Sequence, residues 1–230
     1  FNNQDSLEEF SGRISQQIEI DSITILNTFK DTLFLEKNKL TNASVLEILI
    51  PNTYEVYSNI TELELLDLFR RHYKIFWNST RIKKAKNIGL TQSEVTILAS
   101  IVQMEQQLKF NEHSKIAGLY INRLKSNMKL QADPTVKYAV GDFTLRRILK
   151  KHLKTESPYN TYLHGGLPPG PISIPELQTI DAVLNYESHD YFYMCAKPEY
   201  TGYHNFSKTW DQHNVYSNAY HKWSDQQNIR

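Results

Sequence analysis

The distribution of proline divides this 230-residue chain into two parts of different folding character. Seven of the eight prolines lie between Pro134 and Pro198, and only Pro51 precedes them. Proline has no amide hydrogen to continue a helix or a central strand, so the second part is expected to hold short elements joined by loops. The first part has apolar residues at helical spacing. We therefore predict an α+β fold in which helices dominate, with one core or a main domain and a small companion.

Local patterns predict the individual elements. Apolar spacing and helix-start signals, including a Thr-x-x-Glu capping box at residue 61 and another at residue 91, predict helices over residues 6–20, 22–35, 61–76, 91–108, 114–125 and 175–185. A closing helix carries Tyr216, Ala219, Tyr220 and Trp223. A strand is predicted over residues 45–50, and a β-hairpin joins residues 191–196 to 203–207 across Gly202.

Composition excludes several classes of protein. Lys and Arg number 26 and Asp and Glu 25, a net charge of +1, which is not the overall charge signature of a nucleic-acid binder. The longest apolar runs fall far short of the ~20 residues of a membrane-spanning helix. Cys195 is the only cysteine, which excludes an internal disulfide, and the eight histidines show no HExxH or similar metal-ligand spacing. We predict no metal site.

One carboxylate lies on the apolar side of the helix expected from residue 91. At about 100° per residue from Val95, Glu105 falls near 280°, inside the arc of Leu98, Ile101 and Leu108, whereas Gln103 falls on the polar side. A partly desolvated carboxyl has a raised pKa and can act as a general acid. The alternatives are an ion pair with Arg123 or a frayed, solvated helix end.

Two loops and the hairpin offer candidate binding residues. Asp133 followed by Pro134 fits a helix N-cap and first helical residue, which is a structural role, but Gln131, Asp133 and Thr135 are also candidates for hydrogen bonds to a polar ligand. The turn at residues 157–162 combines hydroxyl, amide and aromatic groups suited to sugars, namely Tyr159, Asn160, Thr161 and Tyr162. An ordinary Asx-turn with packed aromatics explains that turn equally well. His204, followed by Asn205, either faces a cleft or caps the edge of the hairpin.

Seven segments, in order along the chain, resemble the YceG-like (MltG) family of endolytic murein transglycosylases. They are IPNTY at 50–54, LASIV at 98–102 leading to Glu105, INRL at 121–124, MKLQADPT at 128–135, YNTY at 159–162, GLPPGP at 166–171 and HNF at 204–206. The resemblance runs from about residue 46 to the end. It implies that residues 1–45 are part of a LysM-like accessory module and that residues 46–230 form the catalytic domain.

The resemblance also implies an activity and a location. The family cleaves peptidoglycan glycan strands between N-acetylmuramic acid and N-acetylglucosamine and leaves 1,6-anhydro ends. It implies a single-pass anchor in the bacterial cytoplasmic membrane, an extracytoplasmic catalytic domain, glycan strands as substrate and cell-wall synthases as candidate partners. The chain begins with Phe1 rather than methionine, so we expect a processed or trimmed product whose anchor would lie upstream.

Glu105 is the expected catalytic residue, acting first as acid and then as base. The family often has a further acid after the LASIV run, where this chain has Gln103, and we favour Glu105 because of its place on the apolar arc. No cofactor is expected, since the pyridoxal phosphate chemistry suggested by an older family label lacks a phosphate-binding loop here. The alternatives are a hydrolytic muramidase with Asp133 as second carboxylate, or a non-catalytic peptidoglycan-binding protein.

Overall fold

A computed structural model describes residues 1–145 and 147–227, and the last three residues of the predicted catalytic domain lie outside this range. The described part is α+β, with ten α-helices and one two-stranded antiparallel sheet. In chain order the elements are α1 (Leu7–Ile14), α2 (Ser22–Phe29), α3 (Thr32–Asn38), η1 (Val45–Ile48), α4 (Glu62–Phe76), α5 (Ser79–Ile88), α6 (Gln92–Glu105), η2 (Phe110–Glu112), α7 (His113–Lys125), α8 (Asp133–Val140), η3 (His152–Lys154), α9 (Leu177–Leu184), β1 (Tyr193–Ala196), β2 (His204–Ser207) and α10 (Trp210–Gln226).

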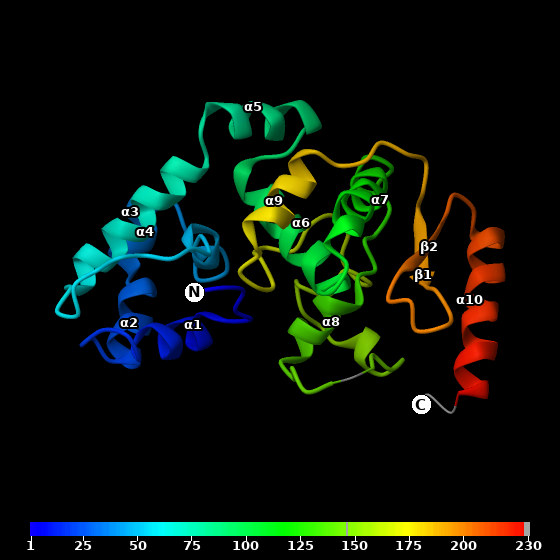
Figure 1. Cartoon of the computed structure of the whole chain (residues 1–230), viewed down its shortest axis with the longest axis horizontal. Coiled ribbons are helices and arrows are strands. Elements are labelled where there is room, and N and C mark those ends of the chain that lie inside the picture. The colour runs from blue at the N-terminus through cyan, green and yellow to red at the C-terminus, as the bar shows by residue number, and fades with distance from the viewer. Residues whose placement is uncertain (146, 228–230) are drawn as a thin grey trace.

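The buried apolar side chains form two clusters that lie side by side (Figure 1). The first cluster packs α1 to α4 and η1 around the rings of Phe10, Phe29 and Phe69. The second surrounds α6 and continues into α7 and α9. Tyr73 of α4 packs against both clusters and so joins them. The predicted domain division at residue 45 stays a prediction.

Helix α6 lies at the centre of the second cluster and contacts α7, α8 and α9. The helical spacing predicts a polar side here, but Thr96, Ser100 and Gln103 are all buried. The Ser100 hydroxyl accepts a hydrogen bond from the backbone amide of Ile172, and the side-chain Oε1 of Gln103 accepts one from the backbone amide of Glu176. The polar side of α6 therefore binds the proline-rich chain before α9 rather than water.

Several elements differ from the prediction. Residues 45–50 contain a buried 3₁₀-helix, η1, rather than a strand. The helix predicted over 6–20 ends at Ile14, and the one predicted over 22–35 is two helices, because the Asp31 carboxylate accepts a hydrogen bond from the Phe34 amide and starts α3. Helix α6 ends at Glu105, which leaves Leu108 80% exposed instead of packed.

Other elements follow the prediction closely. The capping boxes at Thr61 and Thr91 open α4 and α6, and α7 and the β1–β2 hairpin lie at the expected places. Helix α9 begins two residues after Pro175. The prediction missed α5, which Asn78 caps at one end and the left-handed Gly89 at the other. Among the described helices, none is both long and apolar enough to cross a membrane.

Candidate active site

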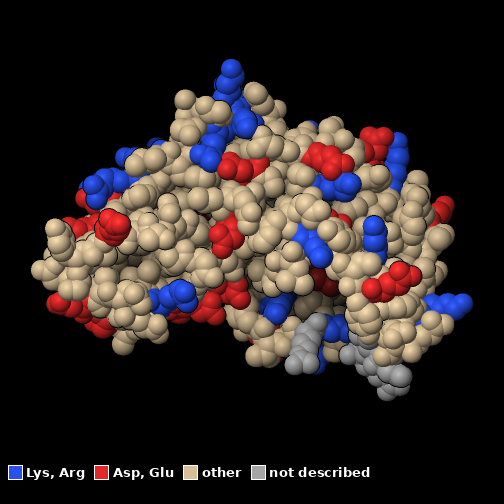
Figure 2. Space-filling view, viewed as in Figure 1, with Lys and Arg blue, Asp and Glu red and all other residues tan. Residues whose placement is uncertain are grey.

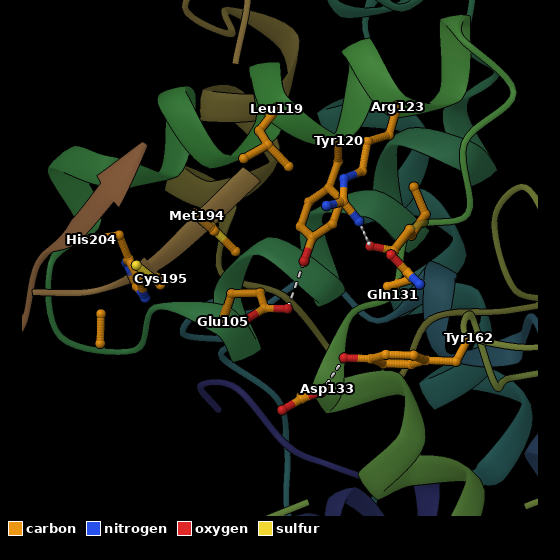
Figure 3. A pocket seen from close by; sticks show the side chains of 12 residues that line it. Glu105, Leu119, Tyr120, Arg123, Gln131, Asp133, Tyr162, Met194, Cys195 and His204 are labelled. Atoms are coloured by element: carbon orange, nitrogen blue, oxygen red, sulfur yellow. Dashed lines mark hydrogen bonds between the residues drawn. The ribbon is translucent and has the colours of Figure 1, made fainter. Parts of the chain in front are cut away.

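The C-terminal end of α6 opens into a pocket of about 250 Å³. Its walls come from α7, from the chain leading into α8, from the turn around Tyr162, and from the hairpin. Figure 3 shows Glu105 between the ring of Tyr120 on one side and Asp133 with Tyr162 on the other. Residues from four separate segments therefore converge on one carboxyl group.

Glu105 is half-buried and protonatable near neutral pH. Burial raises its pKa to about 7, and the nearby Asp133 charge raises it too, while a hydrogen bond from Tyr120 and the charges of His204 and Arg123 lower it. The Tyr120 hydroxyl donates to Oε1 of Glu105 at 2.6 Å. The raised pKa agrees with the expectation from the apolar arc, and a large fraction of this carboxyl is protonated at pH 7.

Arg123 does not form the ion pair with Glu105 that was considered from the sequence; no such pair exists in the described part of the chain. Its guanidinium donates instead to the carbonyls of Phe192, at 2.6 Å, and Leu130, at 2.7 Å. One buried side chain thereby ties the loop before α8 to the segment that enters β1. Its role is to hold two walls of the pocket together.

Asp133 differs from the predicted N-cap. The N-cap of α8 is Ala132, and Asp133 is the first helical residue, with no capping hydrogen bond. Its carboxylate accepts a hydrogen bond of 2.7 Å from the Tyr162 hydroxyl and lines the pocket. The exposed Gln131 also lines the pocket, on a left-handed backbone (φ 50°) whose amide donates to the Thr161 carbonyl.

The structure puts three predicted contact residues inside the protein instead of in the pocket. Thr135, Asn160 and Thr161 are at most 2% exposed. The two threonine hydroxyls lie 2.8 Å apart and bond to Ala132. The Asn160 amide donates to the carbonyls of Leu153 and Thr155, and its oxygen accepts from the Tyr162 amide. These side chains hold the turn at residues 157–162 and so position Tyr162. The structure therefore agrees with the Asx-turn alternative for this turn.

The remaining predicted residues, Tyr159, Asn205 and His204, differ in their places. Tyr159 packs against Tyr138, with ring centroids 4.6 Å apart, and does not line the pocket. Asn205 lines a neighbouring pocket of about 330 Å³. His204 lines both pockets, so it faces a cleft instead of only capping the hairpin.

Sequence reasoning missed the partners that orient these groups. Glu112 is buried and accepts three hydrogen bonds: from the His204 amide at 3.0 Å, from the His204 ring Nδ1 at 2.9 Å, and from the Gln106 amide group at 2.9 Å. Although burial alone raises the pKa of Glu112, these bonds hold it below its usual value. No local sequence signal pointed to Tyr120 or Glu112 as a residue of the site.

Two further pockets adjoin this candidate pocket. A pocket of about 570 Å³ shares Glu105 and Asp133 with it, and the pocket of about 330 Å³ shares His204. Figure 2 shows a hollow on one face with acidic atoms at its base. Among the described residues, no group of three His, Cys, Asp or Glu side chains is arranged to hold a metal ion.

Fold and site together define a helix-rich protein that presents one carboxyl with a raised pKa in an open pocket. The chain belongs to the YceG-like family, whose sequence profile matches residues 1–219. It is 35% identical over 173 residues to an endolytic murein transglycosylase of Bacillus subtilis, covering 75% of this chain and 47% of that protein. It is 31% identical over 156 residues to one of Streptococcus pneumoniae, covering 64% of this chain and 27% of that protein.

A solved structure has the same fold. The crystal structure of a YceG-like protein from Listeria monocytogenes superposes with a TM-score of 0.78 and 28% identity, covering 91% of this chain and 72% of that one. The chain spans 47% of the length of the Bacillus relative and 27% of that of the Streptococcus relative.

Proposed function

We propose that this protein is an endolytic lytic transglycosylase that cleaves peptidoglycan glycan strands between N-acetylmuramic acid and N-acetylglucosamine. The observation that carries the proposal is Glu105, a carboxyl with a pKa of about 7 at the wall of an open pocket. The names of the Bacillus and Streptococcus relatives support the substrate and the reaction class. A general acid works best when its pKa lies near the working pH, as it does here.

The reaction needs only this one carboxyl. Protonated Glu105 gives its proton to the glycosidic oxygen, and the bond from that oxygen to C1 of the muramic sugar breaks. The carboxylate then takes the proton of the C6 hydroxyl as its oxygen bonds to C1, which closes the 1,6-anhydro ring and restores the acid. No water enters, so the second carboxylate of ordinary glycosidases is dispensable.

The neighbouring groups have supporting roles in this proposal. Tyr120 orients the carboxyl through its hydrogen bond to Oε1. Gln131 and Tyr162 offer polar groups to sugar hydroxyls from the opposite wall. His204, held by Glu112, offers its second ring nitrogen for a hydrogen bond to the substrate. The buried Asn160 does not line the pocket, so it does not stabilise the positive charge that develops at C1. In this proposal the substrate's own acetamido group stabilises that charge.

The position of Glu105 within the groove supports cleavage inside a strand. Two further pockets share residues with the catalytic pocket, one through Glu105 and Asp133 and the other through His204. Together the three pockets offer a bound strand room for more than one sugar.

Location and accessory parts follow from the substrate and from the resemblance. Peptidoglycan lies outside the cytoplasm, so we propose that the catalytic domain works there. A single-pass anchor in the cytoplasmic membrane, a LysM-like role for residues 1–45 and contacts with cell-wall synthases rest on the resemblance alone.

A single substitution tests the catalytic proposal. Glu105→Gln keeps the shape of the side chain and removes its acid, and Glu156→Gln, an exposed residue outside the pocket, is the matched control. With purified sacculi, we expect the wild type and the control to release anhydro-muropeptides and Glu105→Gln to release at least about 100-fold less. Undiminished release by Glu105→Gln would rule out this assignment.

Product mass separates the alternatives. Asp133 lies in the same pocket as Glu105, an observation that favours a hydrolytic muramidase as second candidate. Hydrolysis adds one water to the product, while lytic cleavage adds none. Sacculi that bind the protein without any product would instead indicate a non-catalytic binding protein.

A further inference from the structure

The pocket of about 570 Å³ beside the catalytic pocket is lined by charges of both signs. It shares the carboxyls of Glu105 and Asp133 with the catalytic pocket. Its lining also includes the cations Lys137 and Arg147. Figure 2 shows acidic atoms at the base of the hollow and basic atoms along its edge.

The two cations come from different segments and are not neutralised. Lys137 lies one turn after Asp133 on α8 and is half-buried, and Arg147 lies in the loop that follows α8. Neither forms a salt bridge within the described chain. The acids whose pKa the Lys137 charge affects, Asp5 and Asp142, do not line the pocket. Both cations are therefore available to a bound anion.

Much of the remaining lining is apolar or aromatic, and Gln107, His221 and Ser224 add polar groups. Met104, Leu145 and Ile148 supply aliphatic surface, and Tyr220 of α10 supplies an aromatic ring. This combination suits a short peptide, whose methyl and methylene groups cover the apolar wall while its carboxylates meet the cations. A bare sugar chain has no anionic group to use Lys137 and Arg147.

We propose that this pocket binds the peptide stem of the glycan strand through the stem's carboxylates. This inference rests on the proposed function, and it assigns a peptide-substituted strand as the substrate. The stem is attached to C3 of the muramic sugar, the sugar whose C1 reacts at Glu105. A stem leaving that sugar enters the adjoining pocket, where Asp133 and Glu105 repel its carboxylates and the two cations attract them.

The test compares two substrates that differ only in the stem. Soluble, uncrosslinked glycan strands are used either intact or after an amidase has removed the peptides, and kcat/KM is measured from the anhydro ends formed. We expect the wild type to favour the intact strands by about fivefold, the effect of two partly exposed charge pairs. The preference is expected to shrink as salt rises.

Two double variants locate the effect. Lys137→Gln with Arg147→Gln is expected to bring the ratio of the two kcat/KM values close to one. Lys150→Gln with Lys151→Gln removes the same charge from exposed residues of the same loop that do not line the pocket, and it is expected to keep the ratio. Equal rates on both substrates for the wild type, or a ratio that survives the first double variant, would overturn the inference while leaving the proposed function standing.

A binding measurement tests the proposed stem site separately from catalysis. In the Glu105→Gln background, Kd for intact and stripped strands is measured with and without the Lys137 and Arg147 substitutions. Tighter binding of intact strands that disappears with these substitutions supports the stem site even if neither substrate is cleaved, in which case only the proposed reaction fails. Equal Kd values for the two strands overturn the stem site.

Discussion

The hydroxyl of Tyr120 donates a 2.6 Å hydrogen bond to Oε1 of Glu105, and both groups lie at the wall of the same pocket. The two residues come from adjacent helices, α6 and α7, which pack against each other. Burial raises the pKa of Glu105, and this bond, which favours the charged carboxylate, limits the rise. The pair thus fixes both the direction and the acidity of the candidate proton donor.

Removing this hydroxyl changes the pH profile. Tyr120→Phe deletes a bond that lowers the pKa of Glu105, so the pKa rises further above 7. Since the acid form starts the reaction, the fall of kcat/KM at alkaline pH is expected to move up by about one pH unit. The maximal rate is expected to drop because the carboxyl is less well oriented. Tyr57→Phe, at an 86% exposed residue, is the control. If the alkaline fall of kcat/KM in Tyr120→Phe stays at the wild-type pH or moves to a lower pH, the prediction is contradicted.

The hydrogen-bonded pair of Glu112 and His204 gives a prediction about whether the two residues affect activity together or independently. Glu112→Gln removes the negative charge that holds the His204 ring. We expect kcat/KM to fall about tenfold or more and stability to fall by about 1–3 kcal/mol, because a charged hydrogen-bonding partner is lost. If Glu112 acts through His204, the double variant with His204→Asn is no less active than the worse single variant. Additive losses would show that the two residues act independently.

Glu47 gives a prediction about stability and pH. This buried carboxyl accepts a hydrogen bond of 2.6 Å from Ser93, and burial raises its pKa to about 7 from the usual 4.5. A raised carboxyl pKa means that stability is present at low pH and is lost as pH rises from about 4.5 through 7. Relative to wild type, Glu47→Gln is therefore expected to gain up to about 3 kcal/mol between pH 4 and pH 8.

Denaturant unfolding at the two pH values measures this gain, and comparing them removes any effect of the substitution that is independent of pH. Glu36→Gln, at an exposed position on α3, is the matched control and is expected to show no such gain. A pH dependence identical in wild type and Glu47→Gln would contradict the prediction.

The loop at residues 165–171 gives a prediction about packing. A Cβ atom at Gly170 would lie 1.8 Å from the carbonyl oxygen of Ala43, whereas one at Gly165 would have no neighbour within 4 Å. Gly170→Ala must push the segment around Ala43 away from the loop, at an expected cost of about 1–3 kcal/mol. Gly165→Ala is expected to be nearly neutral. Thermal unfolding measures the difference in stability between the two variants. Equal unfolding midpoints would show that the loop rearranges without loss of stability and would contradict the prediction.

Local sequence patterns determined the capped helices α4 and α6, helix α7 and the hairpin. These features follow from helical spacing, caps and turns, which act over a few residues. The 3₁₀-helix η1 was predicted wrongly, because a short apolar run fits either a strand or a buried turn until its neighbours are known.

Only the tertiary structure decided which side chains meet at the pocket. Tyr120 lies 15 residues after Glu105, Tyr162 lies 29 after Asp133, and His204 lies 92 after Glu112. Helix packing and the hairpin bring these pairs together, and no spacing rule encodes them. The same packing buried Thr135, Asn160 and Thr161, whose polar groups satisfy the backbone inside the fold instead of binding a ligand. Sequence patterns therefore predicted the candidate acid and determined its helix, while long-range contacts decided which groups surround that acid.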